Sequence, residues 1–282
     1  MDKDNKEIVE LVDAARGGDQ QALETLIRSV QDMIFNLSLR MLGTVPDAED
    51  ATQEIIIRIL SKLATFRKES AFSTWVYRLA VNSLINYKKS MFSEHPLSFE
   101  YYGQDIRYGK TDEVEDLVEG LCKEQCVEEL KMSCTNVMLQ CLEPESRCIF
   151  ILGTMFKMDS KVTAEVLNIT PENYRQKLCR IRKKVANFLS EYCGLSGTGM
   201  CNCHKRINYA LSEHRINPKK LEFNSLTPLE GKIVKEYTEE MEELYELALT
   251  FENFPNYKSP RAAEEMLGVV LRAAPFKKIQ QF

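Results

Sequence analysis

The sequence predicts an all-α protein with two small helical domains, an acidic linker between them and a helical C-terminal extension. Apolar residues recur three and four positions apart in almost every segment, strict apolar–polar alternation is almost absent, and valine-rich strand runs are missing. The chain has 282 residues, 44% hydrophobic and 28% charged, which is enough for two or three domains with real cores. Wholesale disorder and collagen-like repeats are therefore excluded.

The expected cellular compartment rests on two features that the sequence does not contain, a membrane-spanning stretch and a secretory signal. No stretch approaches the roughly 20 apolar residues that span a bilayer, and the start MDKDNKEIVE has neither the basic flank nor the apolar run of a secretory signal. We expect a cytoplasmic protein without membrane insertion. Nine cysteines at irregular spacing then indicate buried thiols or metal ligands rather than disulfides.

Four helices are expected in the first domain, residues 1–92. Asp19 is placed to cap the long second helix, and Gly43 to close it. Asp47, which follows a proline, is expected to cap the third. The expected ranges are about 8–16, 19–43, 47–66 and 73–89.

A linker and a second domain follow. Residues 93–126 lose the helical periodicity and hold a run of acidic side chains, so we expect a linker there. In residues 127–192, Thr170 is a natural N-cap and Pro171 suits the first position of the helix that it begins. Two helices, a three-residue turn and a basic second helix predict a helix-turn-helix. The expected helices cover about 127–142, 144–156, 160–167 and 171–192.

The C-terminal extension, residues 193–282, opens on a glycine-rich stretch. A long amphipathic helix is expected from about Leu229 to Phe251, and Pro255 interrupts it. A final helix is expected from Ser259 onward. The extension therefore forms a third domain or a tail docked on the first two.

The third helix carries an acidic outer face. Asp50, Gln53, Glu54 and Ile57 lie opposite its apolar stripe. An apolar residue among carboxylates and an amide suits a protein partner with basic side chains, because the apolar centre gains from burial and the acids steer the encounter. The alternative is a solvated acidic helix.

The fourth helix has a face suited to unpaired bases. Its tryptophan, the only one in the chain, can stack on a base while the polar side chains hold the base edge and the phosphates. The alternative is a tryptophan that packs in the core. The residues of this face are Trp75, Arg78, Asn82, Asn86 and Lys89.

The second helix of the helix-turn-helix is strongly basic. Residues 171–187 hold one acidic residue, Glu172, and six basic residues, Arg182 among them. Amide and guanidinium groups on its first turns can contact nucleobase edges in a major groove, and the flanking basic side chains can reach phosphates. The alternative is a helix-turn-helix that binds no DNA. The residues are Glu172, Asn173, Gln176, Arg180 and Lys183, flanked by Arg175, Lys177 and Lys184.

One cluster could hold a metal ion. Cys193, Cys201, Cys203 and His204 supply three thiolates and an imidazole, the donor set of a tetrahedral zinc site. The alternative is a zinc-free loop with oxidisable thiols, and no cofactor is required. No catalytic constellation surrounds any of the three histidines, so we do not expect an enzyme.

Three stretches resemble a known family. Two are similar to the second conserved domain of bacterial RNA polymerase sigma factors of the extracytoplasmic-function (ECF) group: DAEDATQEIIIRILSKLATF and SAFSTWVYRLAVNSLINYKK. The third is similar to their fourth domain: MDSKVTAEVLNITPENYRQKLCRIRKKVANFL. The resemblance covers about residues 7–90 and 127–192, with the acidic tether in place of a third domain. It implies a dissociable promoter-specificity subunit whose partners are core RNA polymerase, promoter DNA in duplex and melted form, and an anti-sigma factor as a further candidate.

The resemblance also implies roles for the exposed faces. Residues 1–92 become sigma domain 2 and residues 127–192 sigma domain 4, which reads the minus-thirty-five element. The recognition helix departs from the family in its start, Pro171 to Tyr174, where small residues and valine are common. The extension resembles one found in a subset of these factors. The implied polymerase contacts are Asp47, Glu49, Asp50, Gln53, Glu54 and Ile57. The implied minus-ten contacts are Phe72, Trp75, Arg78, Asn82, Asn86 and Lys89, with the loop 67–70.

Two other interpretations stay open at the level of the sequence. One is a helix-turn-helix regulator that binds DNA without polymerase and carries a metal- or redox-sensing tail. The other treats the Cys/His tail as a sensor or docking domain that keeps the first two domains closed.

Overall fold

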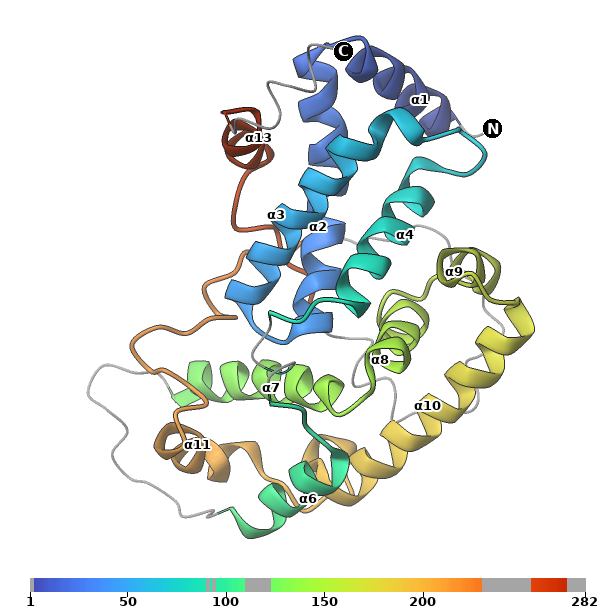
Figure 1. The fold of residues 1–282 in the computed structure, drawn as a ribbon. Helices are drawn as coiled ribbons and strands as arrows, with labels where there is room; N and C mark the ends of the chain where they lie inside the picture. The colour runs from blue at the N-terminus through green and yellow to red at the C-terminus, as the bar shows by residue number, and fades with distance from the viewer. Residues whose placement is uncertain (1–2, 90–91, 93–94, 110–122, 230–254, 273–282) are drawn as a thin grey trace.

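The structure, a computed structural model, describes residues 3–89, 92, 95–109, 123–229 and 255–272. Within these ranges every regular element is a helix, and the only β-type pairing is an isolated bridge between Pro228 and Tyr257. The predicted all-α class is confirmed (Figure 1). In the described part of the chain, no helix is long and apolar enough to cross a membrane.

The first helical unit is built around one long helix. Asp19 caps it, because its carboxylate accepts hydrogen bonds from the backbone N–H groups of Gln21 (2.9 Å) and Ala22 (3.1 Å). Gly43 closes it in the left-handed conformation at φ 90°. Both caps agree with the prediction. The helices are α1 (Lys3–Arg16), α2 (Gln20–Leu42), α3 (Val45–Lys62) and α4 (Phe72–Ile85), with α2 packed against the other three.

Several helix boundaries of the first unit differ from the sequence prediction: α1 begins at Lys3 instead of about residue 8, and α3 ends at Lys62 instead of about residue 66. Thr44, not Asp47, is the N-cap of α3, and its hydroxyl accepts from the Asp47 N–H at 3.3 Å. Asp47 therefore lies in the first turn. Helix α4 ends at Ile85, so Asn86 and Lys89 follow the helix instead of continuing it.

The predicted linker contains a helix, α6 (Phe99–Tyr108), that the sequence did not indicate. Ser98 caps α6 by accepting from the Tyr101 N–H at 3.1 Å. Tyr102 stacks on Phe188 with ring centroids 5.8 Å apart. A side chain at Gly103 would place its Cβ only 2.6 Å from the Tyr192 ring, so the glycine allows this close approach. Packing, not periodicity, accounts for α6.

The second unit contains the predicted helix-turn-helix. Its members are α7 (Lys123–Gln140), α8 (Pro144–Phe150), the π-helical turn η2 (Ile151–Met155), α9 (Ser160–Leu167) and α10 (Pro171–Tyr192). Asp159 rather than Ser160 caps α9, through bonds from the N–H groups of Lys161 (2.7 Å) and Val162 (3.2 Å). The turn to α10 passes through Asn168 at φ 54°.

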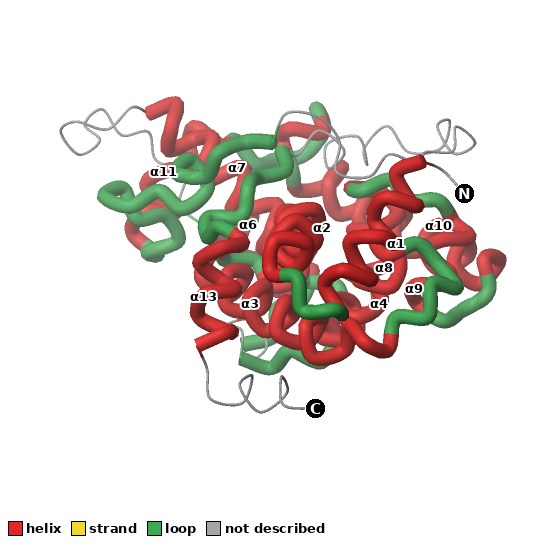
Figure 2. The backbone as a smooth tube through the Cα atoms, turned by 90° about the horizontal axis from the view of Figure 1, so that it is seen from above, coloured by secondary structure: helices red, strands yellow, loops and turns green. Residues whose placement is uncertain are grey.

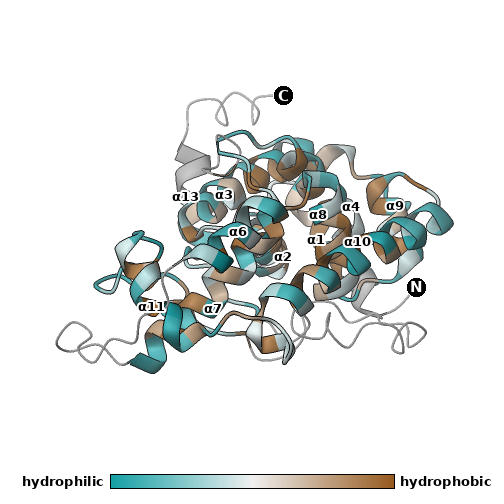
Figure 3. Ribbon diagram, turned by 90° about the horizontal axis from the view of Figure 1, so that it is seen from below, coloured by the Kyte–Doolittle hydropathy of each residue, from teal (hydrophilic) through white to brown (hydrophobic). Residues whose placement is uncertain are grey.

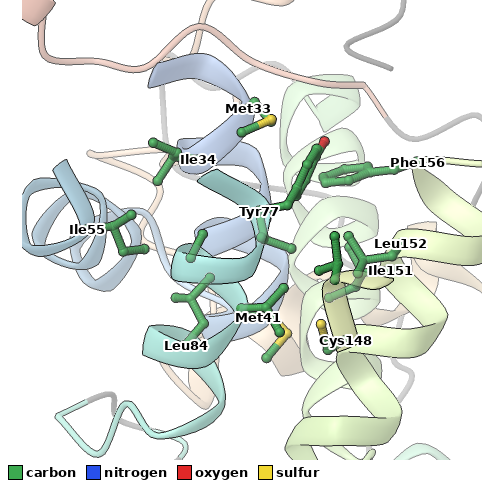
Figure 4. Close-up of a cluster of buried hydrophobic side chains, with 14 of the residues drawn as sticks. Met33, Ile34, Met41, Ile55, Tyr77, Leu84, Cys148, Ile151, Leu152 and Phe156 are labelled. Atoms are coloured by element: carbon green, nitrogen blue, oxygen red, sulfur yellow. The ribbon is translucent and has the colours of Figure 1, made fainter. Parts of the chain in front are cut away.

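The two units share one apolar core. Buried side chains of α2 and α4 meet those of α8 and η2, so the core continues across both predicted domains. Figure 3 shows the hydrophobic positions gathered toward these contacts and many hydrophilic positions on outer turns. The labelled members in Figure 4 are Met33, Ile34, Met41, Ile55, Tyr77, Leu84, Cys148, Ile151, Leu152 and Phe156.

The C-terminal extension returns to both units. Helix α11 (Cys203–Ser212) packs on α7, and α13 (Ala263–Arg272) packs on α2 beside α3 (Figure 2). The predicted final helix is present, although it begins at Ala263 instead of Ser259. Nearly all of the predicted helix from Leu229 to Phe251 lies outside the described residues.

Candidate nucleic-acid and partner interface

The acidic face of α3 points outward as predicted. Ile57 is 42% exposed, whereas Ile55 and Ile59 are buried. Asp50 and Glu54 are exposed beside it. A branched apolar side chain exposed to this degree among carboxylates loses contact with water only when a partner covers it.

Other members of this face already have partners inside the chain. Arg261 of the extension donates to the Gln53 side-chain oxygen at 3.2 Å and lies 3.9 Å from a Glu49 carboxylate oxygen. Glu54 forms an ion pair with Lys89. The structure thus joins a predicted polymerase contact to a predicted DNA contact.

A hollow of about 360 Å³ lies where these two residues meet. Glu54 and Arg58 of α3 line one part of it, and Asn82, Asn86 and Lys89 line another. Two asparagines, a lysine and an arginine in one concave place can bind the edge of a base and its phosphate. Three predicted minus-ten side chains, Asn82 of α4 together with Asn86 and Lys89 beyond its end, therefore line one hollow.

The aromatic residues at the start of α4 pack against one another. Phe72 is buried, and Trp75 is half-buried between Phe66 (5.4 Å between ring centroids) and Phe72 (5.7 Å). Trp75 therefore keeps part of its surface exposed to solvent. Phe72 supports the tryptophan from within the core and does not present a free ring in this arrangement.

The loop before α4 is fixed by α1. Arg16 donates through its guanidinium to the Leu63 carbonyl oxygen at 2.9 Å and also to the Phe66 carbonyl. Lys68, in the left-handed region at φ 60°, forms an ion pair with Asp13 at 2.7 Å. The predicted minus-ten loop, residues 67–70, is therefore tied to α1 through Lys68 and follows Phe66, which packs on Trp75.

Another part of the α4 face is closed by the helix-turn-helix. Arg78 forms an ion pair with Glu165 of α9 at 2.8 Å, and α4 packs on both α8 and α9. Both side chains of this pair are partly exposed. A strand of DNA that contacts Arg78 has to compete with Glu165 for this guanidinium.

The recognition helix α10 presents its predicted residues to solvent. Thr170 accepts from the Asn173 N–H at 3.2 Å, and Pro171 occupies the first turn. Tyr174 is buried against Gly153 of η2, where a Cβ would lie 2.2 Å from the tyrosine oxygen. Burial raises the pKa of Tyr174 to about 12. Seven predicted contacts are exposed and Lys177 is half-buried: Glu172, Asn173, Arg175, Gln176, Lys177, Arg180, Lys183 and Lys184.

Arg182 is the member of the basic run that does not face outward. Only 8% of it is exposed. Its guanidinium donates to the Thr154 hydroxyl at 2.9 Å and to the Gly153 carbonyl at 3.0 Å. A buried guanidinium with these bonds cannot reach phosphate, so Arg182 clamps α10 to η2 instead.

The far end of α10 is covered by the linker helix. The Lys184 ammonium lies 5.1 Å from the centroid of the Phe99 ring, and Arg107 of α6 pairs with Glu191 at 2.9 Å. The first turns of α10 stay open. DNA therefore has access to the N-terminal part of this helix, where Gln176 and Arg180 lie.

The cysteine cluster is partly assembled. The Cys201 N–H donates to the Tyr192 carbonyl at 2.9 Å, which brings Cys201 beside Cys193. Burial raises the pKa of the Cys201 thiol to about 12 and that of Cys203 to about 11, and His204 is exposed. Across the described residues, no three or more Cys, His, Asp or Glu side chains are arranged to hold a metal ion. The zinc site stays a prediction.

Sequence reasoning missed the polar residues that hold the extension in place. Asp105 of α6 accepts from Tyr209 (2.6 Å), from Arg206 (3.0 Å) and from both guanidinium nitrogens of Arg215 (2.6 and 2.7 Å). Glu129 of α7 accepts from the backbone N–H groups of residues 222–224. Asp105 lies in the segment predicted as an acidic linker, and Glu129 lies in the helix predicted over about 127–142, where no role was assigned to it.

A second missed set lies on α2. Asp32, Asn36 and Arg40 are four residues apart on a helix whose neighbouring positions are apolar. This spacing places three polar groups on one helix face and is a signal that the sequence did contain. Asn36 is fully buried and Arg40 is 3% exposed.

The comparisons with known proteins agree with the two motif blocks. The model of the family described as sigma-70 region 2 matches residues 26–90. The chain is 29% identical over 175 residues to the ECF RNA polymerase sigma factor SigW of Bacillus subtilis, an alignment that covers 62% of this chain and 92% of that protein. It is 24% identical over 176 residues to the RNA polymerase sigma-H factor of Pseudomonas aeruginosa, which covers 62% and 90% respectively.

Two further similarities are shorter or weaker. The ECF RNA polymerase sigma-E factor of Escherichia coli K12 is 39% identical over 77 residues, which cover 27% of this chain and 40% of that factor. Among solved structures, CnrH in complex with the cytosolic domain of CnrY is similar with a TM-score of 0.45 and 18% identity, over 64% of this chain and 94% of that one.

Proposed function

Because this chain belongs to the extracytoplasmic-function group of bacterial RNA polymerase sigma factors, we propose that its three exposed polar faces divide the work of promoter recognition. The chain directs RNA polymerase to specific promoters and assists their opening. The single observation that carries this function is the alignment with two named sigma factors over at least 90% of their length. A stand-alone regulator is not supported, because the region 2 match lies outside the helix-turn-helix.

The α3 face is the proposed polymerase contact. Ile57 supplies the apolar centre, and Asp50 and Glu54 supply charge for a basic partner surface. Glu49 and Gln53 join this face once Arg261 leaves them. Asp47, in the first turn of the helix, completes the set.

The α4 face and the recognition helix are the proposed DNA contacts. Trp75 stacks on an unpaired base, and Asn82, Asn86 and Lys89 bind in the hollow beside α3. In the minus-thirty-five element, Gln176 and Arg180 read base edges, and the flanking basic residues hold phosphates. Arg78 takes part after its ion pair with Glu165 opens.

The closed arrangement of the two units gives the mechanism an order. Polymerase binds α3, which needs no movement of the helix-turn-helix. DNA then separates α4 from α9, because Arg78 and the first turns of α10 have to reach elements that lie far apart on promoter DNA. The chain performs no chemical step in this scheme, so we propose that it is not an enzyme and that no cofactor is needed.

Three remaining assignments are also proposals. Because the partner is core RNA polymerase, we place the protein in the cytoplasm. An anti-sigma factor stays a candidate partner. Zinc at Cys193, Cys201, Cys203 and His204 stays a candidate that requires rearrangement of the described residues.

Polymerase dependence tests this function. Fluorescence anisotropy with a labelled promoter, selected from random DNA with the holoenzyme, should show weak binding by the chain alone and tight binding after core polymerase is added. Equal affinity with and without polymerase would instead identify a stand-alone regulator. The variant Asp50→Lys, which leaves the ion pair between Glu54 and Lys89 intact, should weaken the polymerase effect but keep the weak binding of the free chain.

A further inference from the structure

A short segment after Pro255 lies along the first helical unit, and we name residues 255–267 the strap. Its backbone is gripped by the polar set on α2. The Asn36 side chain donates to the Tyr257 carbonyl at 2.6 Å and accepts from the Tyr257 N–H at 2.8 Å. Arg40 donates to the Pro255 carbonyl at 2.7 Å, and Asp32 accepts from the Ser259 N–H at 2.7 Å.

These contacts hold the first half of the strap firmly. Asn36 and Arg40 are almost fully buried, so their hydrogen bonds to the strap are shielded from competition by water. Tyr257 is 5% exposed and packs with Phe35, Leu39 and other apolar residues. The buried end is therefore an anchor.

The second half of the strap reaches α3. Arg261 contacts Gln53 at 3.2 Å and Glu49 at 3.9 Å, and α13 begins two residues later. Figures 1 and 2 both place α13 beside α3. The Arg261 side chain is 38% exposed and Glu49 is 23% exposed. A pair with this much water around it is weak compared with the buried anchor.

The chemistry of the contact matches that of the proposed partner. The α3 face offers carboxylates and an amide to basic side chains, and Arg261 is a basic side chain that already uses two of them. A guanidinium or ammonium of a partner that approaches Glu49 or Gln53 therefore has to compete with Arg261 for these oxygens.

We propose that Arg261 of the strap is an internal competitor for the polymerase-binding face, and that core RNA polymerase displaces it while the anchor at residues 255–259 stays in place. The inference rests on the proposed function of α3. It assigns to the C-terminal extension the role of lowering the affinity of the free chain for polymerase through a contact within the chain.

The test compares core-polymerase affinity of full-length variants. Arg261→Glu should bind about fivefold more tightly than the parent chain, the size expected when one exposed ion pair stops competing. Lys258→Glu is the matched control, since Lys258 is exposed on the same segment and undergoes the same charge change. Its affinity should equal that of the parent. Thermal unfolding of both variants checks that the fold is kept.

A second measurement does not depend on substitution. Hydrogen–deuterium exchange of the parent chain should speed up at residues 261–267 when core polymerase is added, while residues 255–259 keep their protection. Slower or unchanged exchange at 261–267 would overturn the proposal.

The affinities separate the remaining outcomes. Equal or weaker binding by Arg261→Glu overturns internal competition, and equal tightening by Lys258→Glu shows a general charge effect and overturns it as well. In each of these cases polymerase still binds, so the proposed function stands. Failure of the parent chain and both variants to bind polymerase would overturn the proposed function and the inference together.

Discussion

At the residue scale, two neighbouring basic residues of α10 have different environments. Arg182 is buried and bonded to Thr154 and Gly153, whereas Lys183 is exposed. Arg182→Ala leaves those buried acceptors unmet and should lower the free energy of unfolding by about 1–3 kcal/mol. Urea unfolding measures this. Lys183→Ala is the control and should leave stability unchanged while weakening DNA binding; equal stabilities for the two variants would contradict the clamp.

Single substitutions also distinguish residues that read bases from residues that bind phosphates. Arg180→Ala should cost about 1–3 kcal/mol of promoter binding and relax sequence preference at one position. Lys184→Ala should weaken binding to every sequence by a similar factor. Site selection with holoenzyme reports both effects. If site selection with Arg180→Ala gave the same sequence motif as the parent chain, Arg180 would not be a residue that reads a base.

A buried thiol gives a prediction about pH. Burial raises the pKa of Cys148, in the core shared by the two units, from 9.0 to about 12. The unfolded thiol ionises first, so its contribution to stability is complete below pH 9 and is lost as the pH rises toward 12. Cys148→Ala should therefore make the decline of unfolding free energy above pH 9 less steep than in the parent chain. Parallel pH profiles for the two proteins would contradict this assignment.

At the scale of elements, the sequence predicted the helices with local signals and missed those that depend on packing. Asp19, Gly43, Thr170 and Pro171 act as predicted, since a cap is decided by a few neighbouring residues. Helix α6 depends instead on contacts with α10, a partner about 80 residues away that no local pattern reveals. The same reasoning applies to Arg182, because the sequence shows it only as part of the basic run and does not reveal its buried bonds to Thr154 and Gly153.

The close contact of α10 with the π-helical turn gives an element-scale prediction. Gly153→Ala places a Cβ 2.2 Å from the Tyr174 oxygen, so the two elements have to move apart. The variant should lose about 1–3 kcal/mol of stability. Asn187→Ala, on the exposed side of α10, is the control and should unfold like the parent. The same denaturation midpoint for Gly153→Ala and the parent would show that the contact between Gly153 and Tyr174 is not tight.

At the scale of the whole molecule, contacts within the chain cover parts of the faces proposed to bind polymerase and DNA. Glu165 holds Arg78, α6 covers the end of α10, and the strap holds part of α3. The sequence predicted which faces would be exposed and polar, because charge and amide groups stand out against the apolar stripes. It could not show that these faces contact one another, because each contact joins residues far apart in the chain.

Run-off transcription with purified core polymerase is the measurement that tests the sigma-factor function most directly. On a promoter selected with the holoenzyme, the full chain and core should produce a transcript of defined length and make thymines of the minus-ten element reactive to permanganate. Core alone, and core with Asp50→Lys, Glu54→Lys, should do neither. Transcript from core alone, or an unchanged transcript with the double variant, would contradict the account.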